Sequence, residues 1–205
     1  MNKKIEKFIL IMYIISLMFL LTGATYAYFT VLRVSNVSSV IEVDTARLDS
    51  ILFETGLPIS IYADERNFNQ GMGNISSETT ARAYLKTTKE DATYKYNVYL
   101  ELTENNFVYS TENKKAEVIL KVINPSGEEV KSLDGLNYVT GNGYSGFDIT
   151  DAQGKYDIAK NYVISTNNEI VHEWKLSVTL VNLDTDQEVN AGKNLNGYIK
   201  IEKGS

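Results

Sequence analysis

The segment YKYNVYLEL, residues 94–102, alternates between two kinds of side chain at every second position. One set is apolar or aromatic: Tyr94, Tyr96, Val98, Leu100 and Leu102. The other set is mostly polar: Lys95, Asn97, Tyr99 and Glu101. Successive side chains of a β-strand point to opposite faces, so only a strand separates these two sets cleanly. The segment therefore predicts a strand with one buried and one exposed face.

The same alternation recurs in four other segments: Ala81/Ala83/Leu85, Ala116/Val118/Leu120/Val122, Trp174/Leu176/Val178/Leu180 and Leu195/Gly197/Ile199/Ile201. Less regular strands are predicted at 37–43, 59–62, 137–139, 147–150 and 156–164, and turn residues cluster at 124–127, 141–143, 151–154 and 191–194. The helix expected in this part of the chain is 44–53. Many short, half-buried strands separated by turns predict an all-β, antiparallel β-sandwich over residues 28–205.

The first 27 residues differ from this body. Lys3, Lys4 and Lys7 precede an almost unbroken apolar stretch at 8–21, and small residues occupy Thr25 and Ala27. This layout predicts a signal peptide at 1–27 that is cleaved between Ala27 and Tyr28. The alternative is an uncleaved membrane anchor, because residues 24–32 are apolar enough to extend the helix. Either way we expect the body outside the membrane, secreted or attached to the cell surface.

Composition excludes several classes of function. The chain has 205 residues, no cysteine and a net charge of −6, and removal of the positively charged head leaves the body at −8. A body of this charge is repelled by a phosphate backbone, so we expect no nucleic-acid partner. Without cysteine there is no lipoprotein anchor, disulfide framework, thiol nucleophile or thiolate zinc site.

The residues give little support to catalysis. His172 is the one histidine and is followed by Glu173, but no second histidine lies four residues further on, as a zinc protease helix requires. His172 also shares a strand face with Trp174, which favours a structural role. No serine lies in a Gly-x-Ser-x-Gly turn. We therefore expect no enzymatic activity, no catalytic residues and no cofactor.

Two other groups of residues could bind a ligand. The cluster Asp184, Asp186 and Glu188 has oxygen ligands for Ca²⁺ but lacks the twelve-residue loop with its central glycine, which favours an exposed turn without metal. The chain also contains 14 tyrosines. These residues could form a carbohydrate-stacking platform, although tyrosine at alternating strand positions more often packs in the core.

The N-terminal hundred residues resemble a known family. The stretch GATYAYFT at 23–30, followed by TARLD at 45–49, is similar to the entry segment of the TasA/camelysin family of secreted biofilm-matrix proteins. This resemblance implies a jelly-roll-like sandwich, a dedicated signal peptidase and assembly into extracellular fibres. The C-terminal part, WKLSVTLVNLD at 174–184 above all, resembles uncharacterised surface proteins of Firmicutes-type bacteria, which implies no activity.

The segment directly after the expected cleavage site has strong strand propensity and few charges. Its candidate assembly residues are Phe29, Val31, Val34, Val37, Val40 and Val43. A free terminal strand can add to the sheet edge of a neighbour, and such contacts do not close and give filaments. We therefore expect a structural or interaction protein whose partners are further copies of itself or other surface proteins. The alternative is a surface adhesin or glycan-binding module.

Overall fold

The computed structural model describes residues 50–64, 73–88, 90–141 and 143–205. The chain divides into two units, 1–36 and 37–205, and all described residues belong to the second. The expected signal peptide with its cleavage site at Ala27 and Tyr28 lies outside the described residues. So do the predicted strand at 37–43 and all six candidate assembly residues.

The described part is all-β, as predicted. Its strands are β1 (Ser50–Thr55), β2 (Ile59–Tyr62), β3 (Ile75–Lys86), β4 (Ala92–Asn105), β5 (Val118–Ile123), β6 (Asn137–Gly141), β7 (Tyr144–Asp148), β8 (Gly154–Thr166), β9 (Glu169–Leu180) and β10 (Asn194–Lys203). The helical element of the described residues is a short 3₁₀ turn, η2 (Glu188–Asn190).

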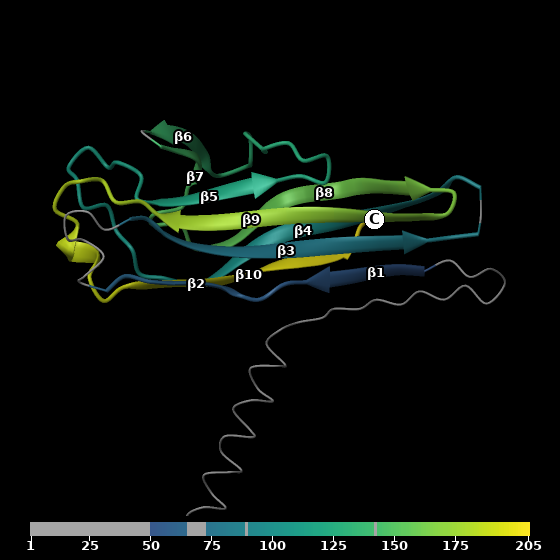
Figure 1. The fold of residues 1–205 in the computed structure, drawn as a ribbon, viewed down its shortest axis with the longest axis horizontal. Coiled ribbons are helices and arrows are strands. Elements are labelled where there is room, and N and C mark those ends of the chain that lie inside the picture. Colours follow the sequence, from purple (N-terminus) through teal and green to yellow (C-terminus); the bar gives the residue numbers. More distant parts are fainter. Residues whose placement is uncertain (1–49, 65–72, 89, 142) are drawn as a thin grey trace, which may run out of the picture. The chain divides into compact units, whose positions relative to one another are not determined.

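These strands form two antiparallel sheets (Figure 1). The six-stranded sheet has the order β1-β3-β9-β5-β7-β6, and the four-stranded sheet has the order β2-β10-β4-β8. Consecutive strands alternate between the two sheets except for β5, β6 and β7, which follow one another in the six-stranded sheet. The longest pairing joins β3 to β9 in an unbroken register from Ile75–Leu180 to Lys86–Glu169.

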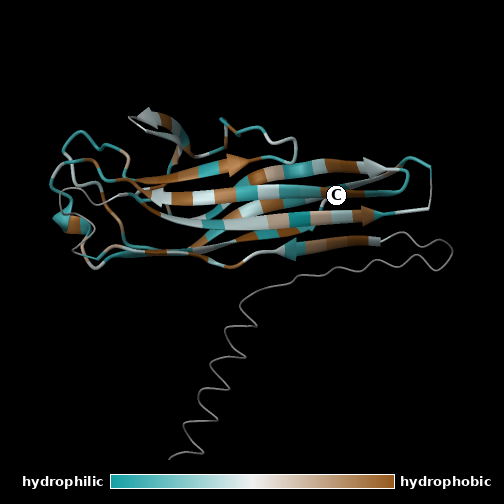
Figure 2. Cartoon of the chain, in the orientation of Figure 1, coloured by the Kyte–Doolittle hydropathy of each residue, from teal (hydrophilic) through white to brown (hydrophobic). Residues whose placement is uncertain are grey.

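The predicted alternation is confirmed by burial. In β9, Trp174, Leu176, Val178 and Leu180 are buried while Lys175 is exposed and Ser177 and Thr179 are half-buried. Figure 2 shows the same alternation of hydrophobic and hydrophilic residues along the strands. Because β9 lies between β3 and β5, its inward side chains have apolar neighbours from both.

Both sheets contribute to one hydrophobic core. Phe53, Leu120 and Trp174 come from the six-stranded sheet, and Tyr96 and Leu100 come from the four-stranded sheet. A hydrogen bond joins the two sheets, since Nε1 of Trp174 donates to the Tyr96 hydroxyl at 3.0 Å. Burial of so many side chains supplies most of the free energy that opposes chain entropy.

Three sequence predictions need correction. The helix expected at 44–53 is wrong at its described end, where Ser50–Phe53 begin β1 and pair with β3. The strand predicted at 147–150 begins earlier, at Tyr144, and ends at Asp148. Tyr99, placed on the exposed face, is 7 % exposed. It stays on the outward face, where Nζ of Lys155 lies over its ring and its hydroxyl donates to Glu202 of β10, so neighbouring side chains cover it.

Candidate functional site

A hollow with a volume of about 500 Å³ lies on the outer face of the six-stranded sheet. Ser76 of β3, Ser177 and Thr179 of β9 and Lys121 of β5 line it, and Tyr144 of the β6–β7 hairpin also lines it. Because alternate side chains of neighbouring strands share a face, the inward-facing core residues leave these polar residues outward. A second hollow of about 250 Å³ shares Lys121 and Ser177 and extends to Glu78 and Lys175. The two hollows share Lys121 and Ser177 as lining residues and are together called the outer groove below.

Hydroxyl groups dominate the floor of the outer groove. Ser76 and Thr179 are cross-strand neighbours on β3 and β9, and their hydroxyl oxygens are 2.8 Å apart, with either able to donate. Ser177 is the next outward residue along β9. These groups can donate and accept hydrogen bonds and carry no charge.

Two glycines of the β6–β7 hairpin make close contacts with their neighbours. Gly141 pairs with Tyr144, and a Cβ at Gly141 would lie 2.1 Å from the tyrosine ring. The ring therefore occupies the space that any larger residue would take. Gly146 has a φ of 148°, and a Cβ there would lie 2.5 Å from the Leu120 carbonyl oxygen. Only glycine permits this approach to β5.

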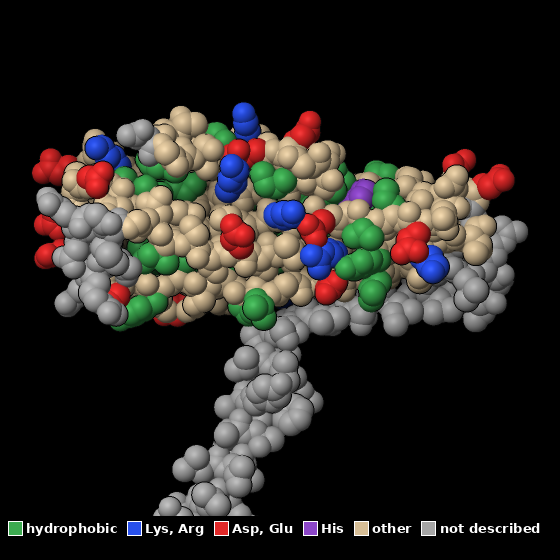
Figure 3. All heavy atoms as spheres, in the orientation of Figure 1, with side chains coloured by type: hydrophobic (Ala, Val, Ile, Leu, Met, Phe, Trp, Pro, Cys, Tyr) green, Lys and Arg blue, Asp and Glu red, His purple; other side chains and the backbone are tan. Residues whose placement is uncertain are grey.

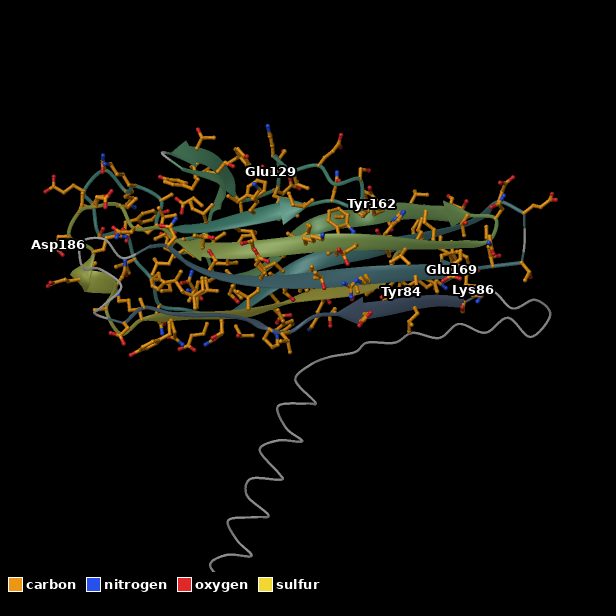
Figure 4. The ribbon with its side chains drawn as sticks, viewed as in Figure 1. Tyr84, Lys86, Glu129, Tyr162, Glu169 and Asp186 are labelled. Carbon is orange, nitrogen blue, oxygen red and sulfur yellow. The ribbon has the colours of Figure 1, made fainter. Side chains whose placement is uncertain are left out.

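Glu129 ties the hairpin to the floor of the groove. Its carboxylate accepts a hydrogen bond of 2.6 Å from the Tyr138 hydroxyl and another from Ser145, and lies 3.3 Å from Nζ of Lys121. The Tyr138 hydrogen bond, followed in importance by Lys121 and Ser145, holds the pKa of Glu129 below its usual range. Figure 4 shows Glu129 beside β5. The single cation of the larger hollow therefore has an acidic partner.

Ion pairs cover another part of the same face. Arg82 of β3 pairs with Glu173 of β9 and lies 3.9 Å from Glu54 of β1, and Lys175 pairs with Glu173 at 3.2 Å. Figure 3 shows positive and negative side chains intermingled here. At the end of the same two strands, Lys86 lies 3.7 Å from Glu169, and Figure 4 shows the two next to one another. This face presents no field of one sign.

His172 lies in an aromatic cluster, on the same strand face as Trp174, as predicted. The Tyr96 hydroxyl is 2.9 Å from its Nδ1 and accepts the Trp174 hydrogen bond. Tyr162 packs edge-on against both His172 and Trp174 (Figure 4 labels Tyr162). Burial raises the pKa of Tyr96 and lowers the pKa of His172, so the tyrosine keeps its proton and the imidazole is neutral; either the hydroxyl or Nδ1 donates in this contact, depending on the tautomer.

This arrangement predicts a loss of stability in mild acid. Burial lowers the pKa of His172 in the folded state, whereas the unfolded side chain titrates near its ordinary value of about 6.5. The unfolded state therefore binds more protons as pH falls through about 6.5, and the free energy of unfolding decreases. We expect His172→Gln, which keeps a hydrogen-bonding side chain for Tyr96, to lack this component. Thermal unfolding at about pH 7.5 and about pH 5.5 measures it.

The contributions of carboxylates to stability are lost in a different pH range from that of His172. Glu173, Glu101 and Glu129 have pKa values lowered from 4.5, so their contributions are lost at lower pH than that of His172. An equal loss of stability in His172→Gln and the wild type between the two pH values would contradict the prediction.

The cluster Asp184, Asp186 and Glu188 is an exposed turn. The Asp186 carboxylate accepts a hydrogen bond from the Glu188 backbone N–H, and Figure 4 shows Asp186 at the end of the strands. Among the described residues, no group of three or more His, Asp or Glu side chains is placed to hold a metal ion. Gln187, within the cluster, is 1 % exposed and points inward.

Sequence reasoning missed a buried carboxylate that Gln187 contacts. Glu117 is fully buried and accepts hydrogen bonds from the Ser110 backbone N–H and from the side-chain amides of Gln187 and Asn190. Asn190 also donates to the Val108 carbonyl and accepts from its N–H. This network joins the loop before β5 to the loop after β9. An acidic residue inside the apolar run at 116–120 was the available signal.

The tyrosines do not gather on one surface of the described domain. Tyr96 and Tyr99 are buried, and Tyr99 carries the Nζ of Lys155 over its ring at 3.4 Å. Tyr62 is 61 % exposed on the edge strand β2. Tyr144 is the tyrosine that lines the larger hollow.

No helix among the described residues is long and apolar enough to cross a membrane. No protein-family model matches the chain, and no curated protein matches its sequence.

Proposed function

We propose that this chain is a secreted or surface-attached, non-enzymatic structural protein that assembles with further copies by adding its N-terminal strand to the sheet edge of a neighbour. Its domain is a jelly-roll-like β-sandwich. Support for the sandwich comes from the alternation of consecutive strands between the two sheets and from the core that both sheets share. Support for export comes from the charged and apolar pattern of residues 1–27.

The edge position of β1 carries the assembly proposal. Among the described strands β1 pairs with β3 alone, in an unbroken register from Ser50–Lys86 to Thr55–Ala81. The other described edges are less suited to pairing: β2 and β6 are short, and the pairing of β8 has register shifts. Regular edges accept further strands most readily. Leu52 of β1 adds an exposed apolar side chain, 37 % exposed.

The candidate assembly strand precedes β1 in the chain and can reach two targets. It can pair with β1 of its own molecule, because residues 44–49 are a sufficient hairpin connection. It can also pair with a neighbour, which produces a filament. Both kinds of pairing use the same type of backbone hydrogen bond. Removing the strand distinguishes them, because it unfolds the domain in the first case and abolishes assembly in the second.

Deletion of residues 28–39 is expected to abolish assembly and leave a folded monomer. Negative-stain microscopy and sedimentation of the protein without residues 1–27 provide the measurement, with thermal unfolding as the check of folding. A monomeric parent whose truncated form melts far lower would refute assembly, because the strand would then belong to its own sheet.

An edge variant gives an independent test. Leu52→Lys places a charge on β1, which opposes strand addition in natural edges. The matched control is Val163→Lys on β8, since Val163 is 49 % exposed on an edge strand of the other sheet. We expect assembly to be lost in Leu52→Lys and retained in Val163→Lys. Equal behaviour of the two variants would argue against β1 as the acceptor.

A further inference from the structure

We infer that the outer groove is a binding site for an uncharged oligosaccharide. The inference goes beyond the assembly proposal and rests on other elements, since the groove lies over β3, β9 and β5 and the assembly proposal concerns β1. Its volume of about 500 Å³ matches that of small-molecule sites in proteins. The second hollow of about 250 Å³ extends it along the face, which suits a chain of sugars better than a single compact molecule.

The polar groups of the groove match the chemistry of a sugar. Ser76, Ser177, Thr179 and Ser145 provide hydroxyls, and Asn74 at the end of the groove provides an amide. Sugar hydroxyls both donate and accept hydrogen bonds, and so do these side chains. The Ser76–Thr179 hydrogen bond holds two of the hydroxyls 2.8 Å apart, so a ligand meets an ordered pair of groups.

The apolar side chains of the groove match the C–H face of a sugar ring. Tyr144 and Ile119 line the same hollow, and a sugar ring presents C–H groups that pack on an aromatic side chain. The Tyr144 ring is held in place, because it lies over Gly141 and packs on the cluster of Ala116, Ile119 and Val181. A fixed ring loses little conformational entropy when a ligand binds.

The electrostatics disfavour other classes of ligand. The larger hollow is lined by one charged side chain, Lys121, and the second hollow adds Glu78 and Lys175; both lysines are paired, Lys121 with Glu129 and Lys175 with Glu173. A phosphate-rich ligand needs several unpaired cations, and a divalent metal ion needs carboxylate or imidazole ligands. Neither set lines the outer groove.

The test is calorimetric titration of the full chain, purified in mild detergent, with chitotetraose and with cellotetraose at millimolar concentrations. These probes share a linear chain of sugar rings and differ in their acetamido groups. Binding of one or both supports the inference and identifies the preferred substituent. Absence of binding by both probes overturns it.

Two variants locate the binding. Ser177→Trp fills the groove from an outward position of β9, and we expect it to weaken binding about tenfold or more. Ser165→Trp is the matched control: Ser165 is exposed on β8 of the other sheet and also lies beside a hydroxyl partner, Thr93, at 3.1 Å. Unfolding midpoints of both variants should equal that of the parent. Equal weakening in the two variants, or none in Ser177→Trp, overturns the assignment of the site.

Tyr144→Leu tests the aromatic wall. Leucine keeps apolar contact with Ile119 but removes the ring, so we expect affinity to fall about tenfold with the hairpin still folded. Unchanged affinity in a folded Tyr144→Leu protein contradicts the stacking role.

Discussion

Replacement of Glu117 by alanine is expected to lower the free energy of unfolding by about 3–5 kcal/mol. The variant leaves the Ser110 backbone N–H and the amides of Gln187 and Asn190 without their acceptor in a fully buried position. Unsatisfied buried donors lose their hydration without compensation, which makes removal of one partner costly. Urea unfolding followed by tryptophan fluorescence measures the change, since Trp174 is buried in the core.

Glu112→Ala is the control for this prediction. Glu112 lies in the same loop and is exposed, so its removal should change stability by no more than about 0.5 kcal/mol. Near-equal effects of the two substitutions would mean that the Glu117 network does not hold the two loops together.

Leu176→Ala is expected to cost about 2–5 kcal/mol. Leu176 is 1 % exposed on β9 and pairs in register with Thr79 of β3 and Val122 of β5. Truncation removes apolar contacts and leaves a cavity that the neighbouring strands cannot close. Since a domain of this kind is stable by only about 5–15 kcal/mol, the shift in the urea midpoint should be large.

Lys175→Ala tests the period of two at the adjacent position. Lys175 is 62 % exposed in its side chain and pairs with Glu173 at 3.2 Å, and an exposed pair contributes at most about 1 kcal/mol. A loss of stability equal to that of Leu176→Ala would show that the two faces of β9 are wrongly assigned.

The assembly and saccharide proposals use different surfaces of the six-stranded sheet. Assembly concerns the backbone hydrogen-bonding groups at the edge of β1, whereas saccharide binding concerns side chains on the outer face of β3, β9 and β5. Under the two proposals, the edge of β1 would hold a neighbour while this face stays open to a polysaccharide. The variants Leu52→Lys and Ser177→Trp should therefore act independently, because they alter different groups.

Strands with regular alternation were predictable, and those without it were not. Residues 94–102 and 174–180 turn their apolar side chains inward at every second position, so their pattern indicates which face of each strand meets the core. Residues 50–55 have no clear alternation, and their pairing with β3 decided their conformation. Pairing with a neighbouring strand overrides the local conformational preference of such a segment.

The candidate site was less predictable than the strands. Sequence reasoning correctly placed His172 beside Trp174 and the cluster Asp184, Asp186 and Glu188 in an exposed turn. It missed the outer groove, because Ser76, Lys121 and Ser177 are far apart in the chain and none belongs to a motif. It also missed Glu117, whose donors lie on two loops.

The amino-acid sequence by itself determined the class of fold and the inward face of each regular strand, because a period of two follows from backbone geometry and the hydrophobic effect alone. Only the tertiary structure decided which strands are neighbours, and with them the edge position of β1, the outer groove and the donors of Glu117. The physical reason is that these features arise from pairs of residues remote in the chain, whose proximity depends on register and topology rather than on local pattern.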